Sequence, residues 1–312
     1  MNTDECEVGY PTLHENGELL RRAKIAWEIM HDCVLCPQEC HVNRRAGQRG
    51  FCRSGDHPII SSYGPHYGEE EPLVGRRGSG TIFFTNCNMR CIFCQNYEIS
   101  QCSVGYEISC ADLAKIMLRL QKGGCHNINF VSPSHFVSPI IRAIDIAASK
   151  GLRIPLVYNS GGYDSVETIT FLQGIFDIYM PDAKYGRNEA AWELSHARNY
   201  VEYNHAVLKE MHRQVGDLLI RDGLAVRGMI IRHLVLPHHL ADSERVFQFI
   251  AEEISKDAYV NIMAQYHYNR LIQYDKNEET PLLKLIQRPI TTEEYVYAIR
   301  CAREVGLHRG FD

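Results

Sequence analysis

Short apolar segments alternate with longer stretches of helical periodicity from residue 80 onward, and this alternation limits the fold more than any other feature of the chain. The predicted strands are Thr81–Phe84, Ile128–Val131, Pro155–Tyr158, Phe176–Met180, Met229–Val235 and Tyr259–Met263. The predicted helices are Ala111–Gln121, Pro139–Ser149, Ser165–Leu172, Glu189–Gln214 as one helix or two, Ser243–Ser255 and Thr292–Val305, the last with a capping-box pattern of Thr291 and Glu294 at its start. Strands that alternate with crossover helices pair in parallel. We therefore expect an α/β fold whose functional residues follow the carboxyl ends of the strands.

The first 79 residues have a different character. A helix is predicted at Leu19–Met30, where apolar residues recur at helical spacing. The stretch from Cys33 to Gly80 is rich in glycine and shows little periodicity. A segment with so little regular structure needs another source of order, and metal coordination supplies one. We therefore divide the chain into residues 1–79, a helix followed by a cysteine-rich and mostly irregular extension, and residues 80–312, the domain of parallel strands.

The charge, the apolar stretches and the cysteine content of the chain indicate which partners and which cellular compartment to expect. The 312 residues include 38 acidic and 33 basic side chains, a formal net charge of −5, which gives no electrostatic reason to expect nucleic acid or an anionic membrane as a partner. The acidic start has no apolar segment behind it, and no stretch approaches the roughly 20 apolar residues of a membrane span. We expect a cytoplasmic protein, in which the 12 cysteines are metal ligands, redox groups or buried small residues rather than disulfides.

Three cysteines stand directly after the first predicted strand, in the spacing Cys87-x3-Cys91-x2-Cys94. Three such thiolates can bind three irons of a [4Fe–4S] cluster and leave the fourth iron without a protein ligand. An open coordination position is typical of catalytic metal sites, and the amine and carboxylate of the methionine part of S-adenosylmethionine (SAM) suit it. The alternatives are inert core thiols, or a zinc knuckle that would need a distant fourth ligand. A thioredoxin-like pair would leave Cys87 without a role.

This motif, with Phe93 before the third cysteine, resembles that of the radical SAM superfamily, and the resemblance extends over about residues 78–312. Within the superfamily the sequence is most similar to glycyl-radical-enzyme activases such as the pyruvate formate-lyase-activating enzyme. More narrowly, it resembles uncharacterised activase paralogues that carry an N-terminal cysteine cluster. The resemblance implies a partial (β/α)6 TIM-like barrel, a [4Fe–4S] cluster on Cys87, Cys91 and Cys94, and SAM as the second cofactor.

Ser132 and Asn159 follow the second and third strands. The activases have a Gly-Gly-Glu turn at the first place, which binds the methionyl amine, and an Asp at the second, and this sequence has neither. Where the sequence departs from the activases, we expect Ser132, Ser134 and backbone carbonyls to bind the cofactor at the first place, and Asn159 to hydrogen-bond a ribose at the second, since an amide hydrogen-bonds without supplying charge. For Asn159 and the glycines Gly161 and Gly162 the alternative is a plain turn.

Charged residues mark the next three strands. Asp182 and Lys184 form an Asp-x-Lys motif after the fourth strand, like that of the activases, and alternation puts both on one face; the alternative is a surface ion pair. Arg232 lies inside the fifth strand, where it needs a cofactor carboxylate or an acidic side chain as partner. By the resemblance Asp182, Lys184, Arg232 and His267, which follows the sixth strand, bind the cofactor, and Lys184 and His267 serve in catalysis.

Four further cysteines, Cys33, Cys36, Cys40 and Cys52, lie within 20 residues of the N-terminal extension. Four thiolates make a closed site, and their spacing suits zinc and a second [4Fe–4S] cluster equally. A structural site would order the loop, an auxiliary cluster would relay electrons or bind substrate, and reduced thiols without metal are the remaining alternative. The run Gly64–Pro72, between the two cysteine groups, is interpreted as a solvated acidic loop or as a loop that faces substrate.

The sequence thus predicts an iron–sulfur enzyme that reductively cleaves SAM to a 5′-deoxyadenosyl radical, which abstracts hydrogen from a substrate. By the resemblance the substrate is a protein glycine, and the electron comes from a one-electron reductant such as flavodoxin or ferredoxin. Two other classes fit the same residues: a non-catalytic iron–sulfur protein for electron transfer, and a zinc-stabilised interaction protein.

Overall fold

Strands and helices alternate over residues 8–268 and 281–311, the part of the chain that the computed structural model describes. The helices are α1 (Tyr10–Glu15), α2 (Glu18–Ile29), α3 (Glu71–Val74), α4 (Tyr97–Gln101), α5 (Cys110–Lys122), α6 (Val137–Ala148), α7 (Val166–Phe171), α8 (Asn188–Ser195), α9 (Tyr200–Val215), α10 (Ser243–Phe249), α11 (Pro281–Leu285) and α12 (Thr292–Glu304). The strands are β1 (Ile59–His66), β2 (Ser79–Phe84), β3 (Tyr106–Glu107), β4 (Ile128–Val131), β5 (Leu156–Ser160), β6 (Ile178–Pro181), β7 (Leu219–Arg221), β8 (Leu224–Leu234) and β9 (Tyr259–Met263).

Six parallel strands lie side by side in the order in which they occur in the chain: β2, β4, β5, β6, β8 and β9. Each corresponds to one of the six predicted strands, so the prediction of an α/β fold with a mostly parallel sheet is confirmed. β1 and β3 extend the sheet antiparallel beyond β2, and β7 pairs antiparallel with β8. Within the described residues no backbone pairing joins β9 to β3, so these two strands stay separate.

The predicted helices are present, with two refinements. The stretch 189–214 forms two helices, α8 and α9, because His196 and Asn199 between them adopt left-handed backbone angles (φ 51° and 50°) that a helix does not accommodate. Helix α10 continues as a π-helical turn, Ile250–Ile254. The capping box of α12 is confirmed: Thr291 Oγ1 accepts from the backbone N–H of Glu294 at 3.2 Å, and the Glu294 carboxylate accepts from the N–H of Thr291 at 2.8 Å.

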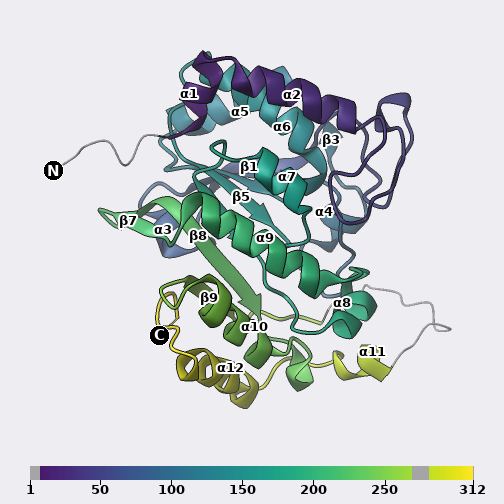
Figure 1. Cartoon of the computed structure of the whole chain (residues 1–312), viewed down its shortest axis with the longest axis vertical. Coiled ribbons are helices and arrows are strands. Elements are labelled where there is room, and N and C mark those ends of the chain that lie inside the picture. Colours follow the sequence, from purple (N-terminus) through teal and green to yellow (C-terminus); the bar gives the residue numbers. More distant parts are fainter. Residues whose placement is uncertain (1–7, 269–280, 312) are drawn as a thin grey trace.

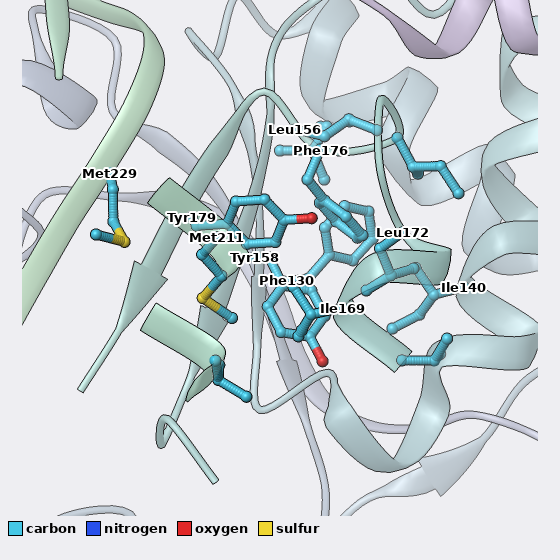
Figure 2. Packing of buried hydrophobic residues seen from close by; sticks show 14 of the residues in the cluster. Phe130, Ile140, Leu156, Tyr158, Ile169, Leu172, Phe176, Tyr179, Met211 and Met229 are labelled. Atoms are coloured by element: carbon cyan, nitrogen blue, oxygen red, sulfur yellow. The ribbon is translucent and has the colours of Figure 1, made fainter. Parts of the chain in front are cut away.

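Alternation along the strands divides the side chains between two faces. Alternate strand residues such as Phe130, Tyr158 and Tyr179 pack against the helices in the main core, where Figure 2 shows them around Phe176. The ring centroids of Tyr158 and Phe176 lie 5.0 Å apart. Intervening residues face the other way and form a second apolar cluster, which includes Val157, Ile178, Met180 and Ile230 and is closed by Leu73 of α3. The segment between β1 and β2 thus packs against this second face of the sheet through α3.

The carboxyl ends of the strands meet at one edge of the sheet. Val131 pairs with Asn159, Asn159 with Met180, and Asp182 with Arg232. The sequence placed its candidate residues at or just after these positions, so the parallel register brings them to the same edge.

The N-terminal segment is packed against the parallel domain. Figure 1 shows α1 and α2 alongside α5 and α6, and α2 contacts α6. His14 Nδ1 lies 2.7 Å from an Asp145 carboxylate oxygen of α6. After α2 the chain runs as a mostly irregular loop on the side of the molecule where α4 and α8 lie (Figure 1), and Thr168 of α7 donates a hydrogen bond to the carbonyl of Leu35 in it at 2.9 Å.

Candidate functional site

Cys87, Cys91 and Cys94 lie in the loop that follows β2, and each sulfur accepts a hydrogen bond. The donors come from three parts of the chain: the backbone N–H of Met89 to Cys87 (3.4 Å), the hydroxyl of Ser195 to Cys91 (3.0 Å), and the hydroxyl of Ser100 to Cys94 (3.2 Å). The loop is held against the end of α8, because the N–H groups of Arg90 and Ile92 donate to the carbonyls of Ser195 and Leu194, both at 3.0 Å. Hydrogen bonds to sulfur are what thiolate ligands of an iron–sulfur cluster require, so these residues fit such a cluster.

Burial dominates the electrostatics of these thiols. It raises the pKa of Cys87 to about 12, with the neighbouring Cys91 adding to the effect. It raises the pKa of Cys91 to about 11, although the positive charge of Lys184 works in the opposite direction. Without a positive ion both groups are therefore neutral thiols at pH 7, and a bound metal would supply the charge that converts them to thiolates.

Lys184 and Asp182, which follow β6, form a largely buried ion pair beside these cysteines, with side chains 14% and 18% exposed. Burial disfavours the charged lysine, but the carboxylate of Asp182 and the sulfur of Cys91 outweigh it, and the pKa of Lys184 is raised. The hydroxyl of Tyr200 fixes the segment, since it lies 3.0 Å from the backbone N–H of Lys184 and 3.1 Å from the carbonyl of Asp182. The pair is therefore internal, and the alternative of a surface ion pair is wrong.

The turn after β5 comes close to both features. A side chain at Gly161 would place its Cβ 2.8 Å from Met89 Sδ and 3.8 Å from Lys184 Cε. Gly162 has a φ of +67°, and a Cβ there would clash with the carbonyl of Asp182. The two glycines thus let the turn, the cysteine loop and the end of β6 approach one another.

Ser132 and Asn159 lie together at the ends of β4 and β5. The backbone N–H of Ser132 donates to the carbonyl of Asn159 at 2.8 Å, and the side chain of Asn159 is buried. Ser132 has a positive φ of 58°, which is uncommon for a residue other than glycine and occurs at ligand-binding turns.

Arg232 of β8 is paired with two carboxylates. Its guanidinium donates to both oxygens of Glu70 at 2.7 Å and also to Glu69, and Asn261 donates to Glu70 at 2.7 Å. Of the two partners that the sequence allowed, an acidic side chain is the one present. The prediction of a solvated loop at Gly64–Pro72 is wrong for these glutamates, whose side chains are 6% and 3% exposed because they face Arg232.

His267 follows β9, and its own side chain is exposed. The preceding Tyr266 is buried against Phe93 of the cysteine loop, with ring centroids 5.9 Å apart, and Gln95 donates to the carbonyl of Gln265. The structure thus brings the segment that contains His267 to the cysteine loop.

The four N-terminal cysteines also come together. Cys33, Cys36, Cys40 and Cys52 line one narrow cavity. The N–H of Phe51 donates to Cys40 Sγ at 3.3 Å, and burial together with the neighbouring thiols raises the pKa of Cys36. In the described part of the chain no three His, Cys, Asp or Glu side chains meet at the spacing of a single metal ion. In a [4Fe–4S] cluster each thiolate binds a different iron, so the ligands surround the cluster rather than converge on one point.

His135 and Arg44 lie in the same place. His135 lines the cavity, and its Nε2–H donates to the carbonyl of Thr85 at 3.0 Å while its buried Nδ1 has no hydrogen-bond partner among the described residues. Burial lowers the pKa of His135 to about 3, so the ring is neutral. The buried guanidinium of Arg44 donates to the carbonyl of Gly55 and lies 3.8 Å from Cys33 Sγ.

The two cysteine groups are joined by direct contacts. Gln38, between Cys36 and Cys40, donates to the carbonyls of Asn88 (3.0 Å) and His196 (3.2 Å). Arg90 donates to the carbonyl of Phe51 at 3.1 Å, and its guanidinium lies 4.3 Å from the centre of the Phe51 ring. The two loops therefore share an interface at the carboxyl edge of the sheet.

Several of these residues had no local signal in the sequence. Ser195 is 104 positions from Cys91, which it contacts, Ser100 follows Cys94 by six positions without any motif to mark it, and Gln38 stands in an irregular loop. Asn129 is different, because it interrupts the apolar strand Ile128–Val131, and both polar atoms of its buried side chain lack a partner among the described residues. A polar residue in a buried strand is a signal by which it could have been found from the sequence, although the prediction did not include it.

A parallel α/β sheet with three partly buried cysteines grouped beyond its first parallel strand is an arrangement that suits an iron–sulfur cluster at the carboxyl edge. The family model described as "Radical SAM superfamily" matches residues 81–250, and the chain belongs to that superfamily. Its members are enzymes that use a [4Fe–4S] cluster to cleave SAM to a radical.

The chain is similar to a curated protein and to solved structures. The "Uncharacterized protein MJ0674" of Methanocaldococcus jannaschii is 35% identical over 301 residues, which cover 93% of this chain and 80% of that protein. Among solved structures, "Structure of TYW1 with a lysine-pyruvate adduct bound" aligns at 12% identity with a TM-score of 0.45, over 73% of this chain and 74% of that one. None of the helices described here has the length and apolar character that crossing a membrane requires.

Proposed function

We propose that Cys87, Cys91 and Cys94 bind the [4Fe–4S] cluster of this radical SAM enzyme. The observation that carries the proposal is that all three sulfurs accept hydrogen bonds, one within the loop, one from α4 and one from α8, next to the largely buried pair of Lys184 and Asp182. This environment suits anionic sulfur ligands, because it supplies donors and a positive charge in a site from which water is excluded.

When bound, the cluster and SAM supply the reductive cleavage that gives the 5′-deoxyadenosyl radical. The chain binds and orients them. Ser132 and Asn159 hydrogen-bond polar groups of SAM from adjacent strand ends, and Lys184, held by Asp182, provides positive charge. The buried aromatic rings around Phe93 keep water from the reacting centre.

Arg232 and His267 complete the proposed set. Arg232 holds the carboxylates of Glu69 and Glu70 at the strand ends, and His267 lies in the loop after β9, whose residues Gln265 and Tyr266 contact the cysteine loop. We further propose that the abstracted hydrogen comes from a protein glycine and that flavodoxin or ferredoxin is the reductant. The Asp182-x-Lys184 motif, which resembles that of the activases, supports this substrate by analogy.

The test is to purify the protein without oxygen, load it with iron and sulfide, and measure 5′-deoxyadenosine after adding dithionite and SAM. The wild type should form it, and Cys91→Ser should form at least about 100-fold less, since a missing ligand abolishes the cluster. Cys102→Ser changes an exposed cysteine outside the site and should behave as wild type. If fully iron-loaded wild type forms no 5′-deoxyadenosine, the proposal fails and a non-catalytic iron–sulfur protein fits better.

The four N-terminal cysteines are proposed as a second metal site, with zinc or a [4Fe–4S] cluster, in the extension formed by residues 1–79. The lining of one cavity by all four supports it. A cytoplasmic location suits seven thiols that must stay reduced to bind metal.

A further inference from the structure

We propose that Cys33, Cys36, Cys40 and Cys52 hold a second [4Fe–4S] cluster that relays electrons to the cluster at Cys87, Cys91 and Cys94. This inference rests on the proposed function and gives a role to the second metal site. It assigns the N-terminal loop to the path by which the catalytic cluster is reduced.

The donor set determines what the second site can do. Four cysteines line the cavity, so a cubane there has a cysteine for every iron and no position left for a substrate. A closed cluster can still gain and lose one electron. Electron transfer is therefore the chemistry that this site offers, whereas a zinc ion in the same place would be redox-inert.

The first bridge between the sites is the contact of Phe51 with Arg90. Phe51 precedes Cys52, and Arg90 precedes Cys91. The Arg90 guanidinium lies 4.3 Å from the Phe51 ring centre and donates to the Phe51 carbonyl at 3.1 Å. The N–H of Phe51 also donates to Cys40 Sγ at 3.3 Å, so this residue contacts both sides of the bridge.

The second bridge is Gln38. Its side chain donates to the carbonyl of Asn88, the residue after Cys87, at 3.0 Å. It also donates to the carbonyl of His196, next to the Ser195 whose hydroxyl donates to Cys91. Two independent contacts thus connect residues within two positions of a ligand of one site to residues near ligands of the other, through bonded and hydrogen-bonded atoms.

The outer side of the second site suits a protein donor. Cys40 and Cys52 are partly exposed, and the exposed charges beside them are two arginines, Arg49 and Arg53, against one glutamate, Glu39. A positive surface at an electron-entry point attracts acidic one-electron carriers with iron–sulfur or flavin groups. In the proposed step such a reduced carrier gives one electron to the N-terminal cluster and is oxidised. That cluster then passes the electron to the catalytic cluster and returns to its oxidised state, and no proton moves.

The experiment uses the whole chain, loaded without oxygen. We expect about eight irons in wild type, and about four in both Cys33→Ser/Cys36→Ser and the Cys87→Ser/Cys91→Ser/Cys94→Ser variant, with no bound zinc. Electron paramagnetic resonance should show that reduced ferredoxin reduces the cluster left in the triple variant. One zinc with four irons in wild type, or no iron in the triple variant, would overturn the relay whether or not SAM is cleaved.

Activity then tests the direction of transfer. With ferredoxin as donor, Cys33→Ser/Cys36→Ser should form 5′-deoxyadenosine at least about tenfold more slowly than wild type, while with dithionite the two should agree within about twofold. Phe51→Leu and Gln38→Ala should keep both clusters, checked by iron content and melting temperature, and slow only the ferredoxin-driven reaction. Equal ferredoxin-driven rates in wild type and the double variant would overturn the relay, whereas a wild type inactive with dithionite contradicts the proposed function instead.

Discussion

At the scale of single residues, Lys184 carries a positive charge that interacts with Cys91. Its ammonium is paired with Asp182, and its Cε lies near the turn that touches Met89. We expect Lys184→Met to keep its iron but to form 5′-deoxyadenosine about 100-fold more slowly, because a preorganised charge next to the reacting centre is lost. Lys209→Met, which removes an exposed lysine, is the matched control.

Lys184→Met also leaves the carboxylate of Asp182 without its partner in the interior. The loss of one partner of such a pair destabilises the folded protein by about 3–5 kcal/mol. The double variant Asp182→Asn/Lys184→Met removes both charges, so it should regain stability in urea unfolding without regaining activity. Activity close to wild type in either variant, measured on iron-loaded protein, would show that the ammonium is not needed.

His233 makes a pH-dependent contribution to stability. It is fully buried in β8, with Nδ1 2.6 Å from the carbonyl of Ala183 and Nε2 2.8 Å from the hydroxyl of Ser243, and burial lowers its pKa to about 4. The unfolded chain binds the proton near pH 6.5, so stability falls as the pH drops from 6.5 towards 4, by about 3 kcal/mol in total.

Urea unfolding at pH 7 and pH 5 measures this contribution. We expect His233→Gln to be less stable than wild type at pH 7, because a well-packed ring is replaced. Its free energy of unfolding should, however, fall less between pH 7 and pH 5 than that of wild type. His308→Gln, at an exposed position, should keep the wild-type slope. Parallel pH profiles for wild type and His233→Gln would contradict the assignment.

At the scale of elements, the short helix α3 between β1 and β2 packs against one face of the sheet through an apolar residue and an ion pair. Leu73 joins the apolar cluster on that face, and Glu70 just before the helix receives the guanidinium of Arg232. The pKa of Glu70 is lowered, because the hydrogen bonds and charge of Arg232 outweigh burial, which acts in the opposite direction. The carboxylate thus stays charged at neutral pH and anchors α3 to β8.

We expect Glu70→Gln to lower the free energy of unfolding by about 3 kcal/mol, because it leaves part of the buried charge of Arg232 uncompensated. The neighbouring Glu71 is exposed, so Glu71→Gln should change stability by no more than about 0.5 kcal/mol. Urea unfolding of Glu70→Gln and Glu71→Gln measures the free energy of unfolding of each variant. Similar effects of both substitutions would mean that the anchor of α3 lies elsewhere.

At the scale of the whole molecule, periodicity predicted what depends on local pattern. The six parallel strands, the helices between them and the capping box of α12 all follow from short-range spacing. The partner of Arg232 did not, since Glu70 is 162 positions away and its choice depends on how α3 folds back. The same holds for Ser195, which is 104 positions from Cys91. Contacts of this kind depend on how elements that are far apart in the chain pack together. No local pattern in a single sequence predicts that packing.

The N-terminal loop and the sheet are stabilised by different means, and metal removal should separate them. The only regular structure in residues 33–58 is one short 3-10 turn, Arg44–Ala46. Cys33 and Leu35 pack in a small apolar cluster that is separate from the main core. If metal orders this loop, its binding free energy is the loop's folding free energy. Chelation should therefore increase amide hydrogen exchange in residues 33–58, while β4, β5 and α6 keep the protection of the main core.

Hydrogen exchange followed by mass spectrometry, on loaded and chelated protein, measures the difference. Cys36→Ser, loaded in the same way, should exchange like the chelated protein in residues 33–58 and like the loaded wild type elsewhere, because only the N-terminal ligand set is broken. Unchanged exchange in the loop after metal loss would show that protein contacts such as those of Gln38 and Arg44 order it without metal. Protection lost throughout the sheet would show that the two parts unfold as one unit.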